Sequence, residues 1–219
     1  ATHGYSSTND LYESTVSVRR TDIEDDNVGV NNPLMQEMGY AAGTHPDELV
    51  FALLNKGRES DCYDGKKSFA ADHPVYPNVD GTGSKTDVSN LLRPAAVESQ
   101  ITDKTAWYLL DVSRPLKPLI FQERTAPELQ AITDTRQDHV FTRDEYLFGV
   151  RYRCAAGFGF WQQAVCCTDD LNADNFVLAL LTLQGFKADG GRPLGLGRGG
   201  KAGLRLGVPG SLYSAALAL

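Results

Sequence analysis

One long stretch in the first half of this sequence has the pattern of a helix, and a block rich in turn-forming residues follows it directly. Pro33 suits the first position of a helix, and Gly57 is a favourable terminator. Pro46 removes one backbone N–H inside the stretch, so the pattern fits one kinked helix over 33–56 and two helices in tandem equally well. The block 57–105 is polar and rich in Gly, Pro, Asn and Asp turns, which predicts irregular surface structure.

Short apolar runs elsewhere predict β-strands, because β-branched and aromatic residues gather in them. An alternating strand is predicted at 11–20, and buried strands at 107–111 and 118–122. Val140-Phe141 and the run 146–165 are also typical of strands, with a bulge or bend near the glycines at 157 and 159.

A second helix is predicted after Asp170 or Asn172, either of which can serve as its N-cap. Its apolar side is predicted to hold Phe176, Val177, Leu180 and Leu181. The stretch 185–210 holds ten glycines and matches the spacing of a phosphate-binding loop. Ala202 stands where such a loop needs Ser or Thr, and no buried strand precedes it, so nucleotide binding is not expected.

Composition excludes several functional classes. With 42% hydrophobic and 22% charged residues, the chain has the balance of an ordinary globular protein. Its net charge of −7 argues against a protein whose main task is to wrap nucleic acid, although the segment after Asp189 contains only basic charges. The longest apolar stretch, 176–183, is far shorter than the ~20 residues of a membrane-spanning helix, so no membrane partner is expected.

The cysteines and a polar cluster give the candidates for chemistry. Four irregularly spaced cysteines indicate a reducing, cytoplasmic compartment, where buried side chains are the simplest role for Cys62, Cys154, Cys166 and Cys167. A metal-dependent hydrolase is one functional hypothesis, because Asp64, Asp72 and His73, with Cys62 and Asp80 nearby, supply metal ligands and acid–base groups. Neither a second His at metal-ligand spacing nor a nucleophile elbow accompanies them, and a hydrogen-bonded turn explains Asp72-His73-Pro74 as well.

A set of longer motifs, in one order along nearly the whole chain, resembles a known family. The motifs are His3-Gly4-Tyr5-Ser6, Tyr12-Glu13, Thr15-Val16, Ile23-Glu24-Asp25-Asp26-Asn27, Pro33, Gln36-Glu37-Met38-Gly39, Pro46-Asp47-Glu48-Leu49, Cys62-Tyr63-Asp64-Gly65, His73-Pro74-Val75-Tyr76-Pro77-Asn78-Val79-Asp80-Gly81-Thr82-Gly83-Ser84, Lys117-Pro118, Phe121-Gln122-Glu123-Arg124, Asp138-His139-Val140-Phe141 and Ala155-Ala156-Gly157-Phe158-Gly159-Phe160-Trp161-Gln162. In these motifs the sequence resembles the major head subunit of Mu-like phages, the gpT family.

The resemblance implies the Hong Kong 97-type capsid fold of tailed phages and herpesviruses, an α+β fold with an extended loop, a spine helix, and peripheral and axial domains. It places the returning strand of the extended loop and its base at 1–31 and the spine helix at 32–57, which favours one helix there. Segments of the axial and peripheral domains fill 58–219, with a strand and a helix in 201–219. Because family members carry a substantial stretch before the His-Gly-Tyr motif, the arm and the outgoing strand are expected to lie outside this sequence.

The implied function is structural: a major capsid protein that self-assembles into hexamers and pentamers of an icosahedral shell around double-stranded DNA, without enzymatic activity or cofactors. The implied partners are scaffold and portal proteins, a decoration protein, and packaged DNA held without sequence specificity, in a virion assembled in the bacterial cytoplasm. We expect the base of the extended loop to contact a neighbouring subunit through charged and aromatic residues, namely Tyr12, Glu13, Arg19, Arg20, Asp22, Glu24, Asp25 and Asp26.

Overall fold

The chain divides into two compact units, each assembled from segments that are distant in sequence. The computed structural model describes residues 7–25, 29, 31–92 and 105–219. Unit 1 comprises 1–6, 53–120 and 158–219, and unit 2 comprises 7–52 and 121–157. The boundaries of the spine helix and of the peripheral and axial domains stay predictions, but the mixture of helices and sheets confirms the α+β class.

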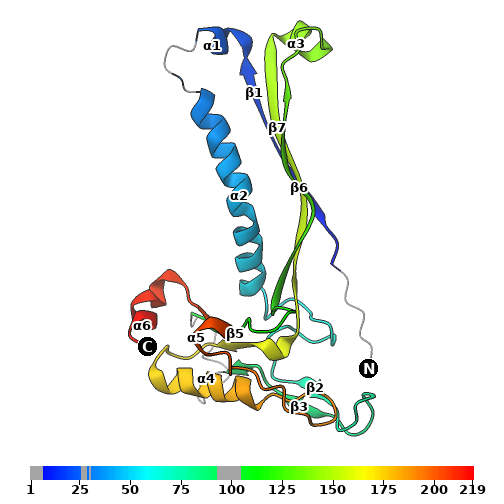
Figure 1. Cartoon of the computed structure of the whole chain (residues 1–219), viewed down its shortest axis with the longest axis vertical. Helices are drawn as coiled ribbons and strands as arrows, with labels where there is room; N and C mark the ends of the chain where they lie inside the picture. The colour runs from blue at the N-terminus through cyan, green and yellow to red at the C-terminus, as the bar shows by residue number, and fades with distance from the viewer. Residues whose placement is uncertain (1–6, 26–28, 30, 93–104) are drawn as a thin grey trace. The chain divides into compact units, whose positions relative to one another are not determined.

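A four-stranded sheet organises unit 1. Its strands, in spatial order, are β4 (Leu91–Leu92), β8 (Ala164–Cys167), β5 (Trp107–Asp111) and β9 (Leu204–Gly207). β4 is parallel to β8, and β5 is antiparallel to both β8 and β9. The other elements of unit 1 are the hairpin β2 (His73–Val75) and β3 (Thr86–Val88), η2 (Trp161–Gln163), α4 (Ala173–Gly185), α5 (Gly200–Gly203), η3 (Gly210–Leu212) and α6 (Tyr213–Leu217), drawn in Figure 1.

Two apolar clusters cover the two faces of this sheet. Successive side chains of a strand point to opposite faces, and β5 is buried along its whole length. Trp107 and Leu109 therefore join the cluster that α4 covers, whereas Tyr108 and Leu110 join a second cluster around Phe69. The predicted buried strand at 107–111 is confirmed as the centre of the unit 1 core.

The same alternation explains the adjacent cysteines. Cys166 lies in the Phe69 cluster and Cys167 in the α4 cluster, so neighbouring thiols face opposite sides of β8. All four cysteines are buried and none forms a disulfide. Their interpretation as small buried side chains is confirmed.

The apolar run 146–165 is broken near Gly159, as its glycines predicted. β7 ends at Phe158, and Gly159 donates its N–H to the carbonyl of Pro118 at 2.8 Å. A Cβ at Gly159 would collide with the carbonyl oxygen of Lys117, so this approach of two backbones excludes any side chain.

Unit 2 contains a three-stranded sheet. Its strands are β1 (Asp10–Arg19), β7 (Glu145–Phe158) and β6 (Leu119–Ile132), in the order β1-β7-β6. β1 runs antiparallel to β7, with Asp10 opposite Cys154 and Arg19 opposite Glu145. Figure 1 shows the three long strands side by side, with α1 (Arg20–Glu24) after β1 and α3 (Asp138–Arg143) connecting β6 to β7. The strand predicted at 11–20 is confirmed.

The stretch around Pro46 forms one continuous helix, α2 (Asn31–Asn55), rather than two in tandem. Within unit 2, its His45 ring lies 4.2 Å from the ring of Tyr12 and 6.0 Å from that of Tyr152, between centroids. These contacts attach the middle of α2 to β1 and β7. Among the described residues, no helix combines the length and the apolar character that crossing a bilayer requires.

Three sequence predictions were wrong. The segment 118–122 begins a strand, β6, but it is not a buried strand, since Ile120 and Gln122 are exposed. Val140-Phe141 lies in α3 rather than in a strand, because Asp144 adopts a left-handed conformation and closes the helix by donating its N–H to Val140. The block 57–105 is not only surface structure, since Phe69, His73 and Asn90 are all buried. Long-range hydrogen bonds and packing hold these turns inside the unit, which a count of turn residues does not reveal.

Candidate functional site

The predicted inter-subunit residues lie on β1 and α1 of unit 2. The charged residues Arg20, Asp22 and Glu24 lie on α1, with Arg19 directly before it and Asp25 directly after it. Tyr12 and Glu13 lie near the start of β1, opposite Tyr152 and Arg151, and are therefore separated from α1 by most of the strand. Asp26 lies outside the described residues. Their role in subunit contacts stays a prediction.

Tyr12 faces inward and is part of the packing of unit 2. Its ring contacts His45, and burial, followed by the nearby Asp10 carboxylate, raises the pKa of its hydroxyl. Glu13 points to the other side of the strand and is exposed, with one carboxylate oxygen 3.8 Å from Nε of Arg151. An exposed pair at this distance is worth little to folding and leaves both groups available to a partner.

Two interactions of Arg20 fix α1. Its backbone N–H donates to the carbonyl of Asp144 at 2.9 Å, which attaches α1 to the junction of α3 and β7. Its guanidinium bonds to the carboxylate of Glu24 at 2.8 Å, an interaction that raises the pKa of the guanidinium. Asp22 and Asp25 are exposed and form no ion pair with any other described residue. The carboxylates of Asp22 and Asp25 are therefore exposed to solvent without an ion pair to any described Lys, Arg or His.

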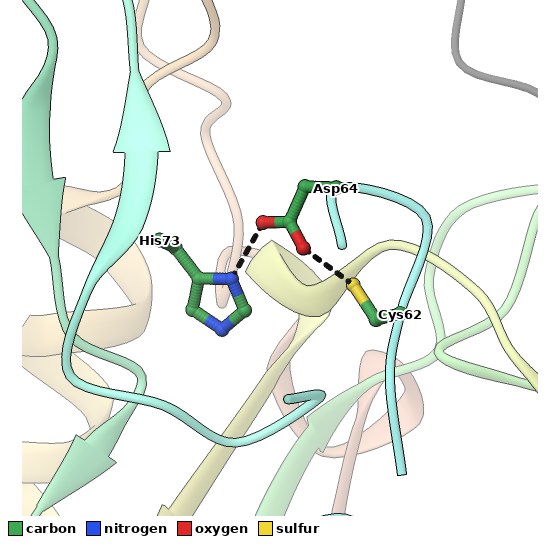
Figure 2. Close-up of side chains that lie close together, drawn as sticks. All are labelled: Cys62, Asp64 and His73. Carbon is green, nitrogen blue, oxygen red and sulfur yellow. Dashed lines mark hydrogen bonds and ion pairs between the residues drawn. The ribbon is translucent and has the colours of Figure 1, made fainter. Parts of the chain in front are cut away.

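A second candidate is a buried polar trio in unit 1, formed by Cys62, Asp64 and His73 (Figure 2). Nδ1 of His73 lies 2.7 Å from one carboxylate oxygen of Asp64, and the Cys62 thiol donates to the other at 3.3 Å. That second oxygen also accepts the backbone N–H of Lys66 at 3.0 Å. The carboxylate is thus the centre of the trio, and both of its oxygens already have donors.

Asn90 holds the imidazole from its other side. The Asn90 amide group donates to the carbonyls of Ser68 and Trp161, and its oxygen accepts the N–H of Ala70 at 2.9 Å. Nε2 of His73 lies 3.2 Å from the same oxygen, and Nδ1 lies 2.7 Å from the Asp64 carboxylate. Both ring nitrogens therefore have hydrogen-bond partners, which fixes the orientation of the ring.

Burial and hydrogen bonding act in opposite directions on Asp64. Burial alone would raise its pKa, but hydrogen bonds from His73 and the Lys66 N–H outweigh it, so the pKa of Asp64 is lowered. Burial, which excludes water from the anion, raises the pKa of the Cys62 thiol to about 12. The carboxylate is therefore ionised at neutral pH, and the thiol is protonated and inert.

The trio does not have the geometry of a metal site, although its donor atoms lie within 4.8 Å of one another. Two ligands of a tetrahedral zinc ion are separated by about 3.3 Å, and the 2.7 Å between His73 and Asp64 is a hydrogen-bond distance. It is not a nucleophile triad either, because Asp64 rather than His73 contacts the thiol. We assign the trio a structural role.

The residues of the hydrolase hypothesis are only partly brought together. Asp72 pairs with Lys66 on the surface, outside the buried trio. Asp80 accepts hydrogen bonds from Thr82 within an exposed turn. Because Asp72 pairs with Lys66 and Asp80 lies in a separate turn, these carboxylates do not gather around His73. The geometry therefore gives the hydrolase hypothesis no support.

Sequence reasoning did not identify two members of this site. Asn90 follows His73 by 17 residues, and Trp161 stacks on the imidazole from 88 positions along the chain. Neither belongs to a motif that includes His73, so no local pattern could have revealed them. Trp161, Trp107, Tyr108 and Phe158 are all buried in the core, whereas Phe160 is exposed.

Comparison with protein families gives a match over the whole chain. The sequence model of the family described as "Mu-like prophage major head subunit gpT" matches residues 1–219. The chain is 50% identical over 194 residues to the major capsid protein of Escherichia phage Mu, and 46% identical over 194 residues to the Mu-like prophage FluMu major head subunit of Haemophilus influenzae. Each match covers 89% of this chain and 62% of the relative, so the chain spans less than two thirds of these relatives.

Comparison with solved structures also finds chains of phage capsids, and these have the same fold as this chain. The procapsid of bacteriophage JBD30 in I4 symmetry contains a chain that matches with a TM-score of 0.78 and 56% identity, over 95% of this chain and 66% of that one. The JBD30 capsid matches with a TM-score of 0.74 and 39% identity, over 98% of this chain and 67% of that one. The expected Hong Kong 97-type α+β fold is confirmed.

Proposed function

This chain belongs to the Mu-like prophage major head subunit gpT family, and on that premise we propose that it is the shell-forming subunit of a tailed-phage head. The match of the family over residues 1–219 is the observation that carries the proposal. The 50% identity to the phage Mu major capsid protein supports it further. The proposed role is structural and needs neither a catalytic residue nor a cofactor.

Assembly is the proposed mechanism. Copies of the chain form hexamers and pentamers that close into an icosahedral procapsid, and the shell expands as subunits rotate as bodies and re-form their contacts. The procapsid and capsid matches of the JBD30 chain support two assembly states for this fold. Scaffold and portal proteins are proposed partners inside the head, and a decoration protein outside it, because one JBD30 match is a capsid decorated with minor capsid protein trimers.

Packaged double-stranded DNA is the proposed content of the shell. The net charge of −7 supports a container that does not grip its cargo, because tight binding to DNA requires many cationic contacts with phosphates. The proposed location is the virion, with assembly in the cytoplasm of the bacterial host. The four buried cysteines, which form no disulfide, agree with folding in such a reducing compartment.

The exposed carboxylates beside α1 are the proposed contact with a neighbouring subunit. Asp22 and Asp25 lack a described partner within the chain, whereas Glu24 already bonds to Arg20. We expect the double reversal Asp22→Lys and Asp25→Lys to block or misdirect assembly, and Glu59→Lys, at an exposed position of unit 1, to leave it unchanged. If the double variant forms shells of normal yield and size, Asp22 and Asp25 do not form the proposed contact between subunits.

Electron microscopy and sedimentation of the purified complete gene product test the proposed function. We expect closed shells of MDa mass at neutral pH. A protein that stays a small oligomer when expressed with the other head proteins of its phage would contradict a role as the shell subunit.

A further inference from the structure

The outward face of α4 is apolar, and no described residue covers it. Val177, Leu178 and Leu181 are 50%, 51% and 59% exposed, while Ala179 and Leu183 on the opposite face have no exposed surface. Val177 and Leu181 thus belong to the apolar side predicted from the sequence, but they face away from the core. Because Ala179 and Leu183 already fill the contact with the core of unit 1, the larger aliphatic residues remain outside.

The composition of α4 does not suit a helix face that stays in water. Asp174 is its only charged residue, at the first turn, and no Lys, Arg or Glu occurs in Ala173–Gly185. A helix that is apolar on both faces is normally buried on both. The face is also held firmly, because the Asn172 side chain caps the helix by accepting the N–H of Asn175 at 2.9 Å.

We propose that a second copy of this chain covers the outward face of α4 in the assembled shell, an inference that rests on the proposed function and names the partner of this surface. A shell built from one kind of subunit repeats heterologous contacts, in which two different surfaces of the same chain meet. Unit 1 offers a second surface of matching chemistry on α6, where Tyr213 and Leu217 are 61% and 71% exposed. Nucleic acid is a poor occupant, since α4 has no cation to meet a phosphate.

Thiol labelling can test this contact without a cysteine-free background, because all four native cysteines are buried. Leu181→Cys places a thiol in the patch, and Ser84→Cys places one in an exposed polar turn of unit 1 as a matched control. Each variant of the complete gene product is treated with a maleimide, first as unassembled protein and then as closed particles. We expect Leu181→Cys to label at least tenfold more slowly in particles, and Ser84→Cys to label at similar rates in both.

The other outcomes overturn the proposal. Fast labelling of Leu181→Cys in closed particles means that the face stays open. Slow labelling already in unassembled protein means that another part of the same chain covers it. Protection that appears only after a different head protein is added identifies that protein as the partner. If the wild-type protein forms no particles under any condition, the proposed function fails first, and that result is distinct from an open face in normal particles.

A second variant separates assembly from folding. Leu181→Asp adds a charge to a half-exposed side chain, so the thermal midpoint of the unassembled protein is expected to stay close to that of the wild type. Particle yield is expected to fall at least tenfold, because the charge would have no water in a closed contact. Ser84→Asp, in the exposed turn, is expected to preserve the yield. A normal yield from Leu181→Asp would overturn the proposal.

Discussion

The imidazole of His73 lies flat against the indole of Trp161, with ring centroids 4.2 Å apart and an angle of 8° between the planes. Trp161 in turn meets Phe186 edge-on at 5.3 Å, directly after α4. The buried trio is therefore one side of a stack that joins the turn-rich block, η2 and the end of α4. Offset stacking of two such rings adds to the apolar packing of this region.

Asp64→Asn is expected to destabilise unit 1 by about 2–3 kcal/mol, because an amide would replace the buried carboxylate that pairs with Nδ1 of His73 and accepts from the Cys62 thiol and the Lys66 N–H. Urea unfolding followed by tryptophan fluorescence measures this change, since Trp161 lies against the imidazole. Asp72→Asn is the matched control: Asp72 pairs with Lys66 in solvent, so its unfolding midpoint should equal that of the wild type. Equal midpoints for the two variants would contradict the structural role of the trio.

Acid sensitivity is expected from Asp111, whose buried carboxylate accepts hydrogen bonds from the Ser113 N–H at 2.8 Å and the Gly197 N–H at 2.7 Å. Burial alone would raise its pKa, but these bonds and the Ser113 hydroxyl outweigh it, so the folded-state pKa lies below the unfolded value of 3.8. The ionised carboxylate therefore stabilises the fold above about pH 4 and loses this effect as pH falls through the lower folded pKa.

Asp111→Asn tests this linkage directly. At pH 7 we expect a loss of about 2 kcal/mol, because an amide group would face backbone donors in place of an acceptor. The difference in unfolding free energy from the wild type should shrink as pH falls from about 4 towards the lower folded pKa, because the carboxylate is protonated in the unfolded state first and in the folded state last. A difference that is the same at pH 7 and pH 3 would contradict the role of the ionised form.

The sequence predicted the elements whose signals are local. Pro33 and the apolar spacing up to Gly57 indicated a helix, and the apolar run 107–110 in β5 indicated a buried strand. The motif resemblance supplied the fold class, which neither signal could provide. Which apolar residues of α4 face the core was not predictable, because Leu183 is fully buried while Leu181 is 59% exposed, and hydrophobicity does not distinguish the two.

The candidate site was less predictable because it depends on long-range contacts. Asp64 and His73 were selected as chemically capable residues, yet Asn90 and Trp161 hold the His73 ring in its orientation. Asp72, adjacent to His73 in sequence, points to Lys66 instead, since a strand start turns successive side chains to opposite sides. Proximity in the sequence therefore suggested Asp72, which pairs with Lys66 instead. It did not reveal Asn90 and Trp161, which contact His73.

Gly159→Ala is expected to destabilise unit 1 by more than about 2 kcal/mol, because the new Cβ meets the carbonyl oxygen of Lys117, and a backbone atom cannot rotate away. Gly39→Ala in α2 is the matched control. No atom lies within 4 Å of a Cβ there, and alanine favours helix by up to about 1 kcal/mol over glycine. Opposite shifts in thermal midpoint are expected, and a neutral Gly159→Ala would contradict the close approach.

The native thiols are expected to resist alkylation and disulfide exchange at pH 8 in the folded protein. Cys154 and Cys166 have no exposed surface, and Cys62, with a pKa of about 12, is thiolate in only about one molecule in ten thousand at that pH. Reaction with a chromogenic disulfide should therefore proceed only as fast as the protein unfolds. In 6 M guanidinium all four thiols should react within the mixing time, which provides the control for reagent and protein concentration. A thiol that reacts in the native protein within seconds would show that one of these cysteines is open to solvent, and Cys62→Ser would establish whether it is the one beside Asp64.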